Sequence, residues 1–232
     1  MSSEQLLVLF VVAGALLSLN PTNIAIFSGL LAGSLGKGHQ RIEQHVVAIS
    51  FLITSFCLYT IVGSMLVVLL SLFSLEALQT VGLVVGIICT LWGLVNIKNY
   101  YWYGRHRDVS LRLSKTLHTN TVKKNDLGSA VLLGLTAGYA ALPNLGAPLL
   151  AFAVIFSLVR PDTTSSIPLL AFILVLPLLI IFILNLRGLK VSSVLKWKED
   201  SKGVFRLGIG LTTIALGWIL FLILNGSTGF AL

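Results

Sequence analysis

Six long apolar runs constrain this chain more than any other feature of its sequence. They cover residues 6–35, 46–73, 77–97, 127–158, 167–186 and 207–224. Each run is close to or longer than the about 20 residues that an α-helix needs to cross a bilayer. Because 56% of the residues are hydrophobic and only 10% are charged, most of the chain is expected to lie in lipid. The runs predict an all-α integral membrane protein with six transmembrane helices.

The first and fourth runs are too long for straight spans, and each has a proline near its middle. Pro21 lies in the segment Leu-Asn-Pro-Thr-Asn, and Pro143 lies in Leu-Pro-Asn-Leu-Gly-Ala-Pro. A helix broken by proline is tolerated in lipid only where it packs against protein or lines a wet cavity. We therefore predict that helices 1 and 4 are broken at Pro21 and Pro143 and that the two breaks form a binding site. The candidate binding residues are Asn20, Pro21, Thr22, Asn23, Pro143, Asn144, Gly146 and Pro148.

The two halves of the chain match each other. Placing Pro21 on Pro143 shifts the first half along the chain by a fixed number of positions. Nearly the same shift, to within two residues, places Gly86 and Gly93 of span 3 on Gly210 and Gly217 of span 6. Three spans in each half force the halves into opposite orientations, which predicts an inverted repeat. The expected division is a first three-helix repeat at 1–103, a basic cytoplasmic linker at 104–126 and a second three-helix repeat at 127–232. Glycines four residues apart, such as Gly82 and Gly86, predict close helix packing.

Basic residues gather on one side of this topology. The chain has 16 Lys and Arg residues and a net charge of +8, and every basic residue except Arg160 falls in the loops on one side. The positive-inside rule makes these loops cytoplasmic and places both termini outside. We expect a protein integral to the plasma (inner) membrane, in contact with the lipid bilayer. The charge is interpreted as a topology signal and not as a nucleic-acid surface.

Residue types that support catalysis are scarce in the spans. All eight acidic residues lie in loops or at span ends, so no buried carboxylate is available to carry protons or bind a cation. The histidines lack metal-ligand spacing, and no phosphate-binding glycine loop or Ser/His/Asp set is present. Cys57 and Cys89 have no counterparts in the second half, which favours packing over a redox role. We expect no catalytic residue, no metal and no cofactor.

Three segments resemble a known family: Ser-Leu-Asn-Pro at 18–21, Gly-Leu-Val-Asn-Ile-Lys-Asn-Tyr-Tyr-Trp-Tyr-Gly at 93–104, and the proline motif at 142–148. With the six-span architecture, they are similar to the CcdA family, the membrane core shared with DsbD-type proteins in the wider LysE-like superfamily. The resemblance implies transfer of reducing equivalents from cytoplasmic thioredoxin to thiol proteins outside, as in cytochrome c biogenesis. Family members carry a cysteine directly after each helix-breaking proline. Here Thr22 and Asn144 occupy those positions, and neither side chain can exchange a disulfide.

Three hypotheses about function follow. The first is an alternating-access transporter of a small polar solute or ion, because Asn and Thr at the breaks supply uncharged donors and acceptors. The second is a thiol-disulfide reductant conduit, or its redox-inactive relative, with a thioredoxin-like partner. The third is a non-catalytic membrane subunit whose basic linker docks a partner. The first hypothesis is preferred, and it makes the protein a transporter and not an enzyme.

Overall fold

The described part of the chain is all-α. The computed structural model describes residues 3–35, 41–101, 127–159, 166–187 and 191–226, and these residues contain no strand. The helices are α1 (Ser3–Ser18), α2 (Pro21–Leu35), α3 (Arg41–Ser71), α4 (Leu75–Tyr101), α6 (Leu127–Val159), α7 (Ser166–Leu186) and α8 (Val191–Gly226). The predicted linker at 104–126 lies outside the described residues. The all-α prediction is confirmed.

Several helices are long and apolar enough to cross a membrane. Four satisfy this by themselves: His45–Ser71 in α3, Leu75–Lys98 in α4, all of α7, and Gly203–Asn225 in α8. A fifth span is formed if Phe10–Ser18 and Pro21–Leu31 are counted together as one bent span. The predicted fourth span corresponds to α6, in which Leu145–Leu158 forms a shorter apolar helix. The protein is therefore an integral membrane protein with four or five clearly apolar spans among the described residues.

The first predicted break lies where the sequence places it. Helix α1 ends at Ser18, α2 begins at Pro21, and the two helix axes differ by 51°. Proline suits the first position of a helix because the N–H that it lacks would have no helical partner there. Asn20 supplies the cap, since its Oδ1 accepts the Thr22 N–H at 3.0 Å. The break is thus a new helix start with its own capping residue.

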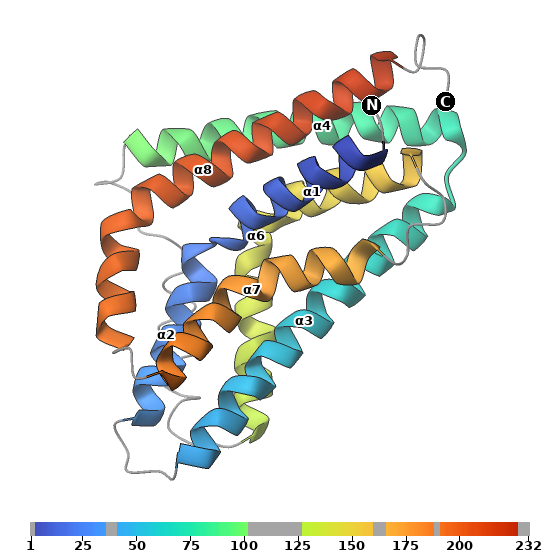
Figure 1. Cartoon of the computed structure of the whole chain (residues 1–232). Helices are drawn as coiled ribbons and strands as arrows, with labels where there is room; N and C mark the ends of the chain where they lie inside the picture. Colours follow the sequence, from blue (N-terminus) through green and yellow to red (C-terminus); the bar gives the residue numbers. More distant parts are fainter. Residues whose placement is uncertain (1–2, 36–40, 102–126, 160–165, 188–190, 227–232) are drawn as a thin grey trace.

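The second predicted break is not an interruption of the helix. Residues 127–159 form one continuous helix, α6, so the prediction that helix 4 is broken at Pro143 is wrong at the level of secondary structure. Its ribbon nevertheless changes direction near the middle (Figure 1). The residue before Pro143 is Leu142, which cannot cap a helix start as Asn20 does before Pro21. Helix α7 likewise continues through the buried Pro177, since neighbouring groups in a helical membrane protein can accommodate a proline.

The helices pack in two connected groups. Helices α4 and α8 lie side by side and run in opposite directions, and α3 packs against α6 and α7 (Figure 1). Helix α1 packs on α7 and α8, whereas α2 contacts α3, α6, α7 and α8. Phe10 in α1 makes edge-to-face contacts with Phe152 and Phe156 of α6, with ring centroids 4.8 and 4.7 Å apart. The short helix α2 is therefore surrounded by helices from both halves of the chain.

Glycine allows α4 and α8 to approach closely. A Cβ atom added at Gly93 would lie 2.6 Å from the Gly210 carbonyl oxygen, and one added at Gly217 would lie 2.7 Å from the Gly86 carbonyl oxygen. These distances are shorter than the 3.4–4 Å of ordinary contact. The crossing therefore admits no side chain at these positions, in agreement with the packing role predicted for Gly86.

The outer surface of the helices is apolar. Ile61 in α3, Leu91 in α4 and Leu222 in α8 are exposed by 63%, 58% and 67%, respectively. Contiguous apolar surface of this kind is rare on water-soluble monomers. Together with the length of the helices, it identifies the bilayer as the surroundings of these side chains.

Candidate functional site

Polar side chains are buried at the break between α1 and α2. Asn20 is 0% exposed, Asn23 is 4% exposed and Thr22 is 9% exposed. Pro21 is buried with them. The helix start brings Asn20 and Asn23 close together, because the capping residue and the third residue of a helix are neighbours. All four candidate residues of the first break therefore form one buried group inside an apolar bundle.

Tyr59 of α3 joins this group. Its hydroxyl oxygen lies 2.6 Å from Asn23 Nδ2, and the tyrosine is only 2% exposed. Ser55, also buried, lies one helical turn earlier on the same face of α3. Phe27 of α2 and Phe51 of α3 pack with ring centroids 5.2 Å apart. Helix α3 therefore forms one wall of the site, a contribution that the sequence pattern did not predict.

Unpartnered polar atoms are found on the helices that form this group. Six buried side-chain nitrogen or oxygen atoms lack a hydrogen-bond partner among the described residues: Asn20 Nδ2, Asn23 Oδ1, Ser28 Oγ, Thr60 Oγ1, Trp92 Nε1 and Asn96 Nδ2. Asn20 caps α2, Asn23 and Ser28 belong to α2, and Thr60 follows Tyr59 in α3. Leaving a buried polar group without a partner costs about 1–3 kcal/mol. Such groups at the start of α2 and on α3 make this region the candidate functional site.

Hydroxyl groups elsewhere in the bundle are satisfied locally. Thr54, Thr90, Ser157, Thr212 and Thr213 each donate to the backbone carbonyl four residues earlier, over distances of 2.7–2.9 Å. This is the usual arrangement of Ser and Thr in helices. Ser28 differs, because it is 0% exposed and its hydroxyl has no such partner. Ser28 in α2 and Thr60 in α3 are therefore the buried hydroxyl groups without a partner among the described residues.

The second group of predicted site residues is described only in part. The side chains of Pro143 and Asn144 lie outside the described residues, and so nothing places them in the site. Pro148 is buried, and a Cβ atom added at Gly146 would meet no atom within 4 Å. Helix α2 packs against α6. The two proline-containing helices are therefore neighbours, as an interface between the predicted breaks requires.

Both cysteines are free thiols. Cys57 is exposed on α3, whereas Cys89 of α4 is buried and donates to the Ala147 carbonyl of α6 over 3.3 Å. No group of three or more His, Cys, Asp or Glu residues that could hold a metal ion occurs in the described ranges. The described site offers uncharged hydrogen-bonding groups and no thiol pair.

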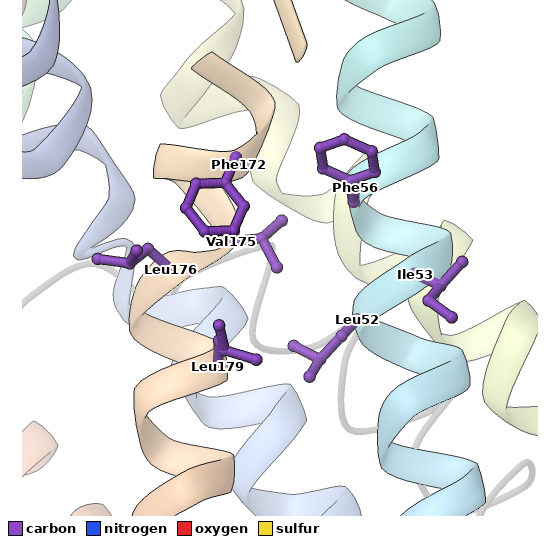
Figure 2. Close-up of a pocket in the computed structure, with 7 residues that line it drawn as sticks. All are labelled: Leu52, Ile53, Phe56, Phe172, Val175, Leu176 and Leu179. Atoms are coloured by element: carbon purple, nitrogen blue, oxygen red, sulfur yellow. The ribbon is translucent and has the colours of Figure 1, made fainter. Parts of the chain in front are cut away.

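A separate groove opens between α3 and α7. It has a volume of about 170 Å³ and is lined only by apolar side chains: Leu52, Ile53, Phe56, Phe172, Val175, Leu176 and Leu179. Figure 2 shows Val175 and Leu179 of α7 and Leu52 of α3 between the two helices. Because Ile53 and Phe172 are also 57% and 47% exposed, the groove borders the lipid-facing surface. Its lining offers nothing to hold a polar solute, so it is distinct from the polar group on α2.

In comparisons with known proteins, no family model, curated protein or solved structure matches this chain. The similarity to the CcdA family therefore rests on the three quoted segments.

Proposed function

We propose that this protein is a membrane transporter that moves a small polar solute or ion through a site at the α1–α2 break. The observation that carries this proposal is the set of buried, partly unpartnered polar groups on α2, inside an otherwise apolar bundle. Irregular backbone at membrane depth is tolerated where it is enclosed by protein or lines a polar cavity. Broken helices in transporters provide such sites near the bilayer midplane.

The proposal includes six spans arranged as an inverted repeat, with cytoplasmic basic loops in the plasma membrane. The α4–α8 crossing supports the repeat. A twofold rotation that exchanges the two halves would replace Gly93 by Gly217 and Gly210 by Gly86. It would thereby convert one close contact, of 2.6 Å, into the other, of 2.7 Å. Two matched contacts in one antiparallel crossing are what a pseudo-twofold axis between α4 and α8 requires.

Helix neighbours also support this symmetry. If the bent pair α1–α2 corresponds to α6 and α3 corresponds to α7, the packing of α3 on α6 corresponds to that of α1 on α7. The packing of α4 on α6 then corresponds to that of α8 on α1 and α2. Each of these contacts is present. In this arrangement α2 and α6 face each other across the axis, where a substrate can be reached from either half.

The proposed mechanism is alternating access. The capped break lets α1 and α2 change their mutual angle without loss of internal helical hydrogen bonds, because each helix has its own end. The glycine-packed pair α4–α8 provides the fixed frame. Access to the polar group on α2 then switches from one side of the membrane to the other as α1–α2 and α6 move.

Cysteine accessibility tests the proposal. In a Cys57→Ser, Cys89→Ser background, Thr22→Cys and Asn144→Cys are labelled singly with a water-soluble maleimide from each side of sealed vesicles. A transporter predicts labelling that depends on the side and falls when a transported solute is added. Labelling at neither position from either side would overturn the central site.

The same variants separate the alternatives. A conserved redox geometry predicts that the double variant Thr22→Cys, Asn144→Cys forms a disulfide that thioredoxin reduces. A non-catalytic subunit predicts labelling that no solute changes. A disulfide that thioredoxin reduces, without solute flux in reconstituted vesicles, would favour the redox conduit over transport. Labelling that no solute changes, again without flux, would favour the non-catalytic subunit.

A further inference from the structure

The start of α2 carries a buried hydrogen-bond donor with no acceptor. The Oδ1 atom of Asn20 accepts the Thr22 N–H at 3.0 Å, which fixes the Asn20 amide group on the helix terminus. The Nδ2 atom of the same amide has no partner among the described residues, and the side chain is 0% exposed. A donor group is thus held next to the helix start by the capping bond of its own amide.

A second donor follows from the contact with Tyr59. Asn23 Nδ2 and the Tyr59 hydroxyl lie 2.6 Å apart, which is short for an N–H···O bond and usual for an O–H···O bond. The oxygen and nitrogen of an amide have nearly the same shape, and their assignment follows from hydrogen bonding. The distance therefore favours Tyr59 as donor to the amide oxygen. In that orientation the unpartnered atom of Asn23 is its –NH₂ group and not Oδ1.

The helix itself adds positive potential at this point. Helix α2 has 15 residues, and its start lies at Pro21, next to both asparagines. Aligned peptide dipoles give a helix N-terminus the effect of about half a positive charge. At this start Pro21 has no N–H, and Asn20 accepts the N–H groups of Thr22 and Ile24, so the helix contributes through its dipole. Half-helix N-termini in membrane transporters face anionic groups for this reason. The backbone and both amide side chains therefore favour the same kind of ligand.

Charges elsewhere in the chain agree with this preference. All eight acidic residues lie in loops or at span ends, so the sequence places no carboxylate at the centre of a span. The net charge of +8, concentrated in the loops of one side, raises the local concentration of anions there. Because the described site contains no lysine or arginine, its hold on an anion is weak, which suits release during transport.

We infer that the N-terminus of α2 binds a small anion, held by the amide donors of Asn20 and Asn23. This inference rests on the proposed transport function and specifies the charge of the group that the site accepts. Halide and carboxylate share the chemistry that the site recognises, a compact negative charge that accepts several hydrogen bonds.

Thermal unfolding of the purified full-length protein in detergent tests binding without any membrane gradient. Sodium formate and sodium chloride are titrated separately against sodium gluconate, at constant ionic strength. We expect formate, chloride or both to raise the unfolding midpoint relative to gluconate, because a ligand that binds only the folded state stabilises it. Formamide, which offers a neutral carbonyl, is expected to give no shift.

Matched serine variants locate the site. Asn20→Ser retains a capping oxygen but removes the –NH₂ donor, and it should lose the anion-dependent shift. Asn96→Ser should keep it. Asn96 is also buried with an unpartnered Nδ2, but it lies near the C-terminal end of α4, where the helix dipole disfavours anions. If Asn20→Ser does not fold, Asn23→Leu provides the second test and should also lose the shift.

Three results would overturn the inference: no shift with either anion, an equal shift with formamide, or an unchanged shift in the Asn20→Ser variant. Flux measurements in vesicles report separately on the proposed function. Anion binding without flux of any solute would refute transport and leave the anion site standing. Flux of a neutral solute without anion binding would refute the anion site alone.

Discussion

Adding a methyl group at Gly93 should weaken the α4–α8 crossing. A Cβ atom at this position would lie 2.5 Å from Ile214 Cγ1, 2.6 Å from the Gly210 carbonyl oxygen and 3.0 Å from the Ile214 backbone nitrogen. Two of these atoms belong to the backbone, so a change of side-chain rotamer cannot relieve the overlap. Helices α4 and α8 must separate, and the contacts on both sides of the crossing weaken with them.

The size of the effect follows from two opposing terms. Replacing glycine by alanine within a helix contributes about 1 kcal/mol of stability through helix propensity. Overpacking of a tight contact costs about 1–3 kcal/mol. Gly208→Ala isolates the first term, since Gly208 lies inside the partner helix, α8, and a Cβ atom there would meet nothing within 4 Å. The free energy of unfolding of Gly93→Ala should therefore lie about 1–3 kcal/mol below that of Gly208→Ala.

Unfolding of the purified variants by dodecyl sulfate in mixed micelles, followed by circular dichroism, measures this difference. Gly217→Ala should cost about as much as Gly93→Ala, because its Cβ atom meets the Gly86 carbonyl oxygen at 2.7 Å. Equal stability of the Gly93→Ala and Gly208→Ala variants would refute the tight crossing. A large cost at Gly93 with none at Gly217 would instead refute the twofold relation between the two contacts.

Three further predictions concern the site, the thiols and the topology. Tyr59→Phe should lower the free energy of unfolding by about 1–3 kcal/mol, measured in the same titration, because the Asn23 amide group loses its buried partner; an unchanged value would contradict this hydrogen bond. The Cys57→Ser, Cys89→Ser variant should remain folded and retain solute flux in vesicles, since a serine hydroxyl can also donate to the Ala147 carbonyl; loss of flux in a folded, monodisperse preparation would show that a thiol is required. A reporter inserted at His118 should be active only on the cytoplasmic side, as the distribution of basic residues requires, and external activity would reverse the proposed topology.

The sequence by itself determined that the chain lies in lipid and that its spans are helical. Apolar runs of membrane-spanning length specify helices because an exposed backbone cannot be hydrogen-bonded in lipid. The break at Pro21 was also predictable, since Asn20 can cap the helix that proline begins. These features depend on short stretches of chain and on the surrounding lipid.

Only the tertiary structure decided which polar groups gather. The pattern around Pro143 resembled that around Pro21, yet α6 remains one helix, because leucine precedes this proline and neighbouring helices can accommodate the missing N–H. Tyr59 gave no signal in the sequence, since a tyrosine in an apolar run can face lipid, protein or the interface. Its role depends on α3 packing against α2, which brings its hydroxyl to Asn23 across 36 positions of the chain. Likewise, the sequence shows that positions 86 and 217 are both glycine, but not that the two residues meet. The antiparallel packing of α4 and α8 places Gly86 and Gly217 opposite each other.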